Sequence, residues 1–291
     1  MPYYAYRGQS KNFGDELNHF LMPKLMGGPS TRSDNLILGI GSIIFDFHPP
    51  HLTKVVLGAG FGGYTKPPVL DDRWKVLALR GPRTARALQL DPSLAVADLA
   101  VMVSLYRDPS IQKSFKFSFM PHFESLERSD WEIACRLAGI NFIDPRWEVE
   151  RVLESLQQSE VLISEAMHGA IVADAFRVPW IAVLPNDPSH RPKWYDWAEA
   201  LNVTVNFQPL RPASVYEWLD NVRIHKHTLR RITRPMASHL KQIAKERFLE
   251  LAARDLVRVS ASSPQLSRQE DLSDSVDKFG PLIDLVRREY W

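Results

Sequence analysis

Short apolar runs alternate with amphipathic stretches along most of the chain, and this alternation predicts strands separated by helices. The first part contains four runs typical of buried strands, at 35–41, 54–60, 74–80 and 94–98. Helices are expected at 15–25 and, after a proline that signals a helix start, at 83–88. Strands that alternate with helices are typical of parallel sheets, so the sequence predicts an α/β fold.

A polar stretch at 108–116 interrupts this pattern, and a second alternating set follows it. Its predicted strands are 115–122, 139–144, 160–164, 179–184 and 203–207. Its predicted helices are 128–138, 147–158, 167–176 and 193–201. We therefore expect two open α/β domains in series, at 1–112 and 113–259. In such folds ligands bind at the carboxyl ends of the strands.

The last part of the chain has a helical pattern. Residues 212–259 are predicted to form long helices, although Pro235 interrupts them. Their apolar positions near helical spacing are 229, 232, 236, 240 and 243. The polar stretch 260–275 predicts a linker, and 276–289 predicts one more amphipathic helix. Residues 260–291 are thus expected to lie outside the two domains.

Composition limits the class of protein. A length of 291 residues with 45% hydrophobic residues allows two cores of ordinary domain size. The sequence starts without a signal-peptide pattern, and no apolar run reaches the ~18 residues of a membrane span, which predicts a cytoplasmic protein. Cys135 is the single cysteine, and no Cys/His group has zinc-finger spacing. We therefore expect neither a disulfide nor a metal.

The charge is unevenly distributed. Residues 221–260 hold ten Lys and Arg against three acidic residues, a local charge of +7 that leaves −5 for the remainder of a chain whose net charge is +2. Such a block suits a polyanion or an acidic membrane surface, and a solvated helix face gives similar counts. Aromatic residues do not interleave with the basic positions, so a nucleic-acid partner is not expected.

The familiar short catalytic motifs give little support to common enzyme classes. The sequence has no G-x-S-x-G, P-loop, H-E-x-x-H or zinc-deaminase signature. Residues 58–63 match G-x-G-x-x-G, but two prolines follow where a dinucleotide-binding helix would have to begin. These glycines either allow a close approach of backbone or substrate, or form a tight turn.

Charged side chains and imidazoles stand at the predicted carboxyl ends of strands. Arg80 ends one strand, His122 ends another, and Glu165 and His168 follow a third within the sequence SEAMHGA. A single such histidine is more often structural, but two at equivalent strand ends indicate a shared cleft. Arg80 is suited to grip a phosphate or carboxylate, because a guanidinium donates paired hydrogen bonds.

Two further segments have both a structural and a functional interpretation. Near the start, Asn12, Gly14 and Asp15 open a predicted helix, where an acidic residue either stabilises the helix dipole or forms a cleft wall. At 190–197, the sequence HRPKWYDW contains Lys193 and Trp194. Aromatic residues at this spacing are more often core than sugar-stacking groups.

Six motifs follow one another in a fixed order between about residues 8 and 210. They read NFGDELN, VVLGAGFGG, LRGPRTA, VADLAVM, MPH and VLISEAMHGAIVADAFRVPWIAV. In this order they resemble the polysaccharide pyruvyltransferase family, and most closely its members that add ketal-linked pyruvate to exopolysaccharide repeats such as succinoglycan. The resemblance implies two Rossmann-like domains facing a cleft, a GT-B-like arrangement with the active site between the domains.

The family's second-domain motif usually reads S-x-R-L-H-G, and its Arg and His contact the donor. Here Ser164, His168 and Gly169 match, Met167 replaces Leu, and Ala166 stands at the Arg position. The resemblance implies a donor site formed by Arg80, His168, Met167, Gly169, Ser164 and Gly60. The missing charge is expected to come from Arg177, Arg191 or Lys193.

The resemblance also implies the reaction and its partners. Pyruvate passes from phosphoenolpyruvate to two hydroxyls of a sugar, with release of phosphate and without a cofactor. His168 is expected to be the general acid, with Asp15 and His122 as further catalytic groups. The acceptor or cleft residues are expected to be Asn12, Gly14, Glu165, Lys193 and Trp194.

The expected acceptor is an oligosaccharide, in particular a lipid-linked one. The anionic head groups of the inner membrane surface and the pyrophosphate link of such an acceptor would both attract the basic block. The sequence leaves the oligomeric state open. Two alternatives remain: a GT-B glycosyltransferase that uses a nucleotide sugar, and a non-catalytic relative that binds a glycan or an anionic ligand.

Overall fold

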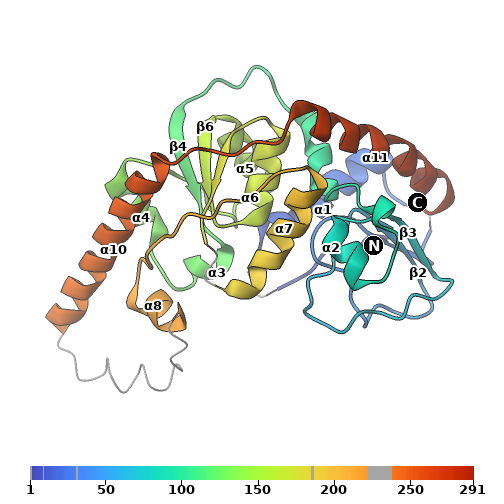
Figure 1. Cartoon of the computed structure of the whole chain (residues 1–291), viewed down its shortest axis with the longest axis horizontal. Helices are drawn as coiled ribbons and strands as arrows, with labels where there is room; N and C mark the ends of the chain where they lie inside the picture. The colour runs from blue at the N-terminus through green and yellow to red at the C-terminus, as the bar shows by residue number, and fades with distance from the viewer. Residues whose placement is uncertain (1, 9, 31, 185–186, 222–237) are drawn as a thin grey trace.

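The structure is a computed structural model that describes all residues except 1, 9, 31, 185–186 and 222–237. It contains two parallel sheets, one of three strands in the order β1-β2-β3 and one of four strands in the order β5-β4-β6-β7. Figure 1 shows the sheets in separate parts of the molecule, with helices α1 and α7 drawn between them. The α/β class predicted from the alternating pattern is confirmed.

The first sheet has two buried strands rich in β-branched and aliphatic residues and a third strand that is partly exposed. Its strands are β1 (Asn35–Leu38), β2 (Thr53–Leu57) and β3 (Trp74–Ala78). The helical elements of this half are α1 (Phe13–Met26), α2 (Pro82–Ala87) and the 3₁₀ segments η1 (Pro92–Leu94) and η2 (Leu99–Tyr106). As the sequence indicates, Pro82 occupies the first turn of α2.

The second sheet is richer in aromatic residues, and its central strands are buried mainly at their carboxyl ends. Its strands are β4 (Phe115–Met120), β5 (Asn141–Phe142), β6 (Ser159–Ser164) and β7 (Trp180–Ala182). Its helices are α3 (Phe123–Leu126), α4 (Trp131–Ala138), α5 (Val149–Gln157), α6 (Met167–Ala175) and α7 (Arg191–Ala200), with a 3₁₀ turn η3 (Pro188–His190) before α7.

The strand order of the second sheet determines where a ligand site can form. The chain runs from β4 outward to β5 and then returns to place β6 on the other side of β4. Such a reversal opens a crevice at the carboxyl ends of the two central strands. Here those ends lead directly into His122 and into the segment that holds His168.

Two predicted strands are wrong. The segment 94–98 forms only an isolated bridge between Ala95 and Leu79, because Asp98 turns its carboxylate onto the backbone N–H of Ala100 and starts η2 instead. The segment 203–207 contains no strand either, and an isolated bridge joins Gln208 to Val183. Apolar alternation alone does not reveal a side-chain cap.

The described C-terminal part is helical, as predicted, in α8 (Val215–Asn221), α10 (Ser238–Ser260) and α11 (Gln269–Glu289). The predicted linker is too long, because α11 already begins at 269 with acidic residues in its first turn. The predicted apolar positions 229, 232 and 236, and half of the basic positions, lie outside the described residues. No described helix is long and apolar enough to cross a membrane.

Helix α11 packs against the first half of the chain, beside α1 and η2 (Figure 1). Its buried face includes Phe279 and Ile283, which join the core that α1 contributes to. Two hydrogen bonds hold its end: Asn35 Nδ2 donates to the Tyr290 carbonyl at 2.8 Å, and Trp291 Nε1 donates to the Gly28 carbonyl at 2.9 Å. The terminal helix is therefore part of the N-terminal half's packing.

Candidate active site

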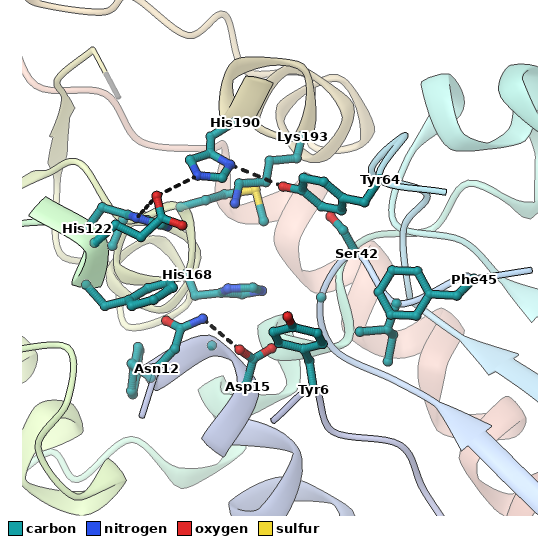
Figure 2. A pocket seen from close by; sticks show the side chains of 18 of the residues that line it. Tyr6, Asn12, Asp15, Ser42, Phe45, Tyr64, His122, His168, His190 and Lys193 are labelled. Atoms are coloured by element: carbon teal, nitrogen blue, oxygen red, sulfur yellow. Dashed lines mark hydrogen bonds and ion pairs between the residues drawn. The ribbon is translucent and has the colours of Figure 1, made fainter. Parts of the chain in front are cut away.

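A cavity of about 450 Å³ lies between the two halves of the chain, and both halves supply its walls. The first half contributes polar and aromatic groups, among them Tyr6, Asn12, Asp15, Ser42, Phe45 and Tyr64. The second half contributes His122, Glu124, Ala166, Met167, His168, His190 and Lys193. Figure 2 shows side chains from both halves converging on one space. The predicted strand-end histidines thus share a cleft.

His168 projects into the cavity from the first turn of α6 (Figure 2). Its Nε2 lies 3.6 Å from Oδ2 of Asp98, and both atoms are buried with no hydrogen-bond partner in the described structure. The other carboxylate oxygen of Asp98 accepts the N–H of Ala100. The carboxylate of Asp98 is fixed beside Nε2 and therefore favours a proton on that nitrogen of the His168 ring. The other ring nitrogen, Nδ1, is left for the cavity.

The start of α1 fits closely around His168. A Cβ at Gly14 would overlap Nδ1 of the imidazole, so only glycine lets the helix approach this ring. Asn12 Nδ2 donates to Asp15 Oδ2 at 2.9 Å and orients that carboxylate. Burial raises the pKa of Asp15, while the Asn12 hydrogen bond and the positive charges near it act against that increase. Asp15 is therefore the more basic carboxylate that a proton acceptor requires.

Lys193 supplies a cation to the same cavity from α7. Burial lowers its pKa to about 8, and the neighbouring Arg80 adds repulsion. No hydrogen bond or ion pair to its Nζ occurs within the described residues. Ala166, at the family's Arg position, lines the cavity as well. Of the three basic residues considered as replacements, Lys193 lines the cavity, and Arg177 instead donates to Ser267.

His122, Glu124 and His190 form a second polar group in the cavity, close to His168 (Figure 2). His190 Nε2 lies 3.4 Å and His122 Nδ1 lies 3.7 Å from Oε2 of Glu124. The other ring nitrogen of His190 is 3.1 Å from the Tyr64 hydroxyl. Burial and nearby positive charges hold the pKa of His122 well below its usual range, whereas the His190 hydrogen bond lowers the pKa of Glu124.

Glu165 does not line the cavity but holds the segment that carries His122. Its buried carboxylate accepts the backbone N–H of His122 at 2.8 Å and the Ser125 hydroxyl at 3.0 Å. Both donors lie at the start of α3, where unpaired backbone N–H groups favour an acidic partner. Glu165 therefore links the carboxyl end of β6 to the loop after β4.

Arg80 lies behind the cavity wall rather than in it. The guanidinium is fully buried, donates from Nε to Asp196 at 3.0 Å and from Nη1 to the hydroxyl of Ser42 at 2.7 Å, and Ser42 lines the cavity. A Cβ at Gly60 would overlap this guanidinium, so Gly60 makes room for Arg80. Gly58 approaches the backbone of Leu99 in a left-handed conformation. The glycines of the G-x-G-x-x-G match thus allow close approaches.

Three other predicted site residues also lie outside the cavity. Ser164 donates to the Ala166 carbonyl at 2.7 Å, and Gly169 packs tightly against Met120 and Ser164. Trp194 is fully buried among aromatic rings. The exposed aromatic residues at the cavity are instead Tyr6, Phe47 and Tyr64.

Sequence reasoning missed several residues that the structure brings together. Asp98 lies within the motif VADLAVM, and its signal was an acidic residue after an apolar run. Glu124 stands two positions after His122, and His190 begins the segment HRPKWYDW. Their association needs the contact between η3 and α3, which pairs residues 66 positions apart.

The fold and the cavity define an α/β enzyme with an imidazole, a carboxylate and a cation in one cleft. Residues 12–188 match the polysaccharide pyruvyl transferase family. The chain is 34% identical over 317 aligned positions to the succinoglycan biosynthesis protein ExoV of Rhizobium meliloti (strain 1021), covering 100% of this chain and 99% of that protein. The chain therefore belongs to the polysaccharide pyruvyl transferase family, and it is a pyruvyltransferase.

A solved structure of the wall teichoic acid polymerase TagF, variant H548A, is also similar to this chain. The comparison covers 97% of this chain and 88% of that one, at 9% sequence identity and a TM-score of 0.38. A similarity this low supports no conclusion about function.

Proposed function

We propose that this chain transfers pyruvate from phosphoenolpyruvate to two hydroxyls of a sugar in an exopolysaccharide repeat unit of the succinoglycan type. The observation that carries the proposal is His168, which faces the cavity with Asp98 behind it and with Lys193 lining the same cavity. Membership of the family and the similarity to a succinoglycan biosynthesis protein support the choice of reaction and of acceptor.

The reaction asks for one proton donor and one proton acceptor. The enol methylene of phosphoenolpyruvate takes a proton and becomes a methyl group, the two sugar oxygens bond to the central carbon, and the bond to phosphate breaks. The two hydroxyl protons balance the one gained by the methyl group and the one carried away by phosphate. His168 would give the first proton from Nδ1 in its doubly protonated form, whose charge the carboxylate of Asp98 would stabilise. Asp15 would accept a hydroxyl proton, because burial makes its carboxylate more basic.

The donor carries a carboxylate and a phosphate, so the site needs positive charge. Lys193 would supply it where the family's usual Arg is replaced by Ala166. Arg80 would act indirectly, by fixing the hydroxyl of Ser42 and by adding positive potential behind it. Lys193 of α7 would thus take over the charge of the family's arginine, whose position Ala166 occupies.

The acceptor would bind at the mouth of the cavity, where aromatic side chains are exposed. Tyr6 and Tyr64 are each 49% exposed and Phe47 is 59% exposed. Exposed rings around a polar cavity are suited to stack against the apolar faces of sugars. We further propose that the acceptor is lipid-linked. The basic residues after 221 would attract this chain to an anionic membrane surface, where such an acceptor lies.

Donor choice tests this function. Purified protein is incubated with an oligosaccharide or extracted lipid-linked repeat units and either phosphoenolpyruvate or a panel of nucleotide sugars. We expect release of inorganic phosphate that depends on both phosphoenolpyruvate and acceptor, and a product heavier by one ketal-linked pyruvate in mass spectrometry. Release of nucleotide would identify a glycosyltransferase instead. Failure to bind phosphoenolpyruvate in calorimetry would indicate a non-catalytic relative.

A further inference from the structure

The cavity also holds two imidazoles and a carboxylate that the proposed reaction does not use. His122 follows β4, Glu124 lies in α3, and His190 ends η3. One nitrogen or oxygen atom from each of the three lies within 4.8 Å of the other two. All three side chains line the cavity, so the space between them is continuous with the proposed substrate site.

The distances within this group suit a common metal ion. Glu124 Oε2 is 3.4 Å from His190 Nε2 and 3.7 Å from His122 Nδ1. A tetrahedral ion with bonds of ~2.1 Å holds its ligand atoms ~3.4 Å apart. Small side-chain rotations would therefore bring the three atoms into one coordination sphere.

Contacts from outside the group already orient its members. The Nδ1 of His190 lies 3.1 Å from the hydroxyl of Tyr64, which leaves Nε2 turned toward Glu124 (Figure 2). The backbone N–H of His122 donates to Glu165 and fixes the start of α3. A histidine that binds a metal usually has a second partner on its other ring nitrogen, as His190 has in Tyr64. This partner sets the tautomer and the direction of the ring.

We propose that His122, Glu124 and His190 bind a divalent transition-metal ion whose remaining coordination positions face the cavity. Two imidazoles and one carboxylate suit Zn²⁺, Co²⁺, Mn²⁺ or Fe²⁺, whereas Mg²⁺ and Ca²⁺ prefer all-oxygen sites. An open position would accept an oxygen of a bound sugar or phosphate. The proposal departs from the expectation of no metal, because the third ligand follows the first by 68 positions and forms no compact sequence motif.

Lys193 lies near this group, and its positive charge would repel a metal ion bound there. Glu124 and Asp187 lie near Lys193 and compensate in part. The balance is expected to lower the affinity of the site for an ion without removing it. An anionic substrate placed between Lys193 and the ion would then strengthen the binding of both.

The test measures metal binding directly, apart from pyruvyl transfer. The full chain is stripped with a chelator, exchanged into chelator-free buffer and titrated with Zn²⁺ in a calorimeter and with Co²⁺ in a spectrophotometer. We expect one equivalent of each ion to bind, with the visible bands of a low-coordinate Co²⁺ site. His190→Ala and Glu124→Gln should each weaken binding by at least ~100-fold, and Tyr64→Phe by about 10-fold.

Matched variants separate this site from other histidines and from misfolding. His51→Ala removes an exposed imidazole remote from the cavity and should bind like the unchanged protein. Circular dichroism and thermal melting identify variants that fail to fold, and Glu124→Gln keeps the shape of the side chain for the case in which a histidine variant does not fold. Absence of saturable binding in the unchanged protein, or full binding in a folded Glu124→Gln variant, would overturn the proposal.

Discussion

The two histidine-bearing walls of the cavity are built in different ways. In the His168 wall, which consists of His168, Asp98 and Gly14, the imidazole is backed by a fully buried carboxylate. In the His122 wall, formed by His122, Glu124 and His190, the shared carboxylate is itself one-third exposed. A buried partner fixes one ring for one proton transfer, whereas a partly exposed partner leaves room for an added ligand.

Removing the imidazole of the His168 wall should have the largest effect. His168→Ala is expected to lower kcat by about 10²- to 10⁴-fold, because the enol carbon loses its proton donor. Phosphate release from phosphoenolpyruvate in the presence of acceptor measures the loss. His51→Ala, with an exposed histidine outside the cavity, is the matched control and should keep full turnover. Normal turnover of folded His168→Ala would remove His168 from the mechanism.

Changing the carboxylate behind that imidazole should have a smaller effect. Asp98→Asn keeps an oxygen for the N–H of Ala100 but loses the charge beside Nε2, and kcat should fall about 10²-fold. The loss is expected to be smaller than in a serine-protease triad, because the two atoms stand 3.6 Å apart.

A double variant distinguishes positioning from folding. If Asp98 acts through His168, then adding Asp98→Asn to His168→Ala should cost almost nothing further in kcat. The matched control is Asp91→Asn, since Asp91 caps η1 through the N–H of Ser93 and is remote from the cavity. Independent losses in the double variant would show that Asp98 does not act through His168.

Removing the cation of the second half should affect donor binding most and kcat least. Lys193→Met is expected to raise KM for phosphoenolpyruvate about 10-fold, because a charge-assisted hydrogen bond is lost. In the unchanged protein KM should rise as pH increases through about 8, where Lys193 loses its proton. Lys193→Arg should keep the low KM at higher pH, and a pH-independent KM would contradict the assignment.

The Lys193→Met substitution should increase the stability of the fold. Folding lowers the pKa of Lys193 from 10.5 to about 8, so between these values the unfolded chain binds more protons and the free energy of unfolding rises with pH. At pH 7 the full cost of burying the charge is present, and Lys193→Met should raise the free energy of unfolding by about 1–3 kcal/mol. Urea denaturation measures this, with exposed Lys75→Met as the control.

The sequence predicted the β/α alternation well, because strands buried on both faces leave continuous apolar runs. It failed at 94–98, where the carboxylate of Asp98 caps η2 and ends the extended segment. Side-chain capping depends on local geometry that an apolar pattern does not contain.

The sequence predicted a site at the carboxyl ends of the strands, but it did not predict which side chains turn into that site. His122, His168, Asp15 and Lys193 line the cavity, as residues near strand ends and helix starts can. Arg80 also ends a strand, yet it turns toward Asp196, a partner 116 positions later. Only the packing of α7 against α2 brings that partner into place, and no short-range signal reports it.

The contacts of helix α11 have a consequence for folding during synthesis. The buried ring of Trp291 donates to the Gly28 carbonyl across 263 positions, so the packing around α1 is complete only after the chain has been synthesised through residue 291. Until then part of the apolar surface of α1 and η2 has no cover. The nascent N-terminal half is therefore expected to expose apolar surface, and to be prone to aggregation, until α11 packs against it.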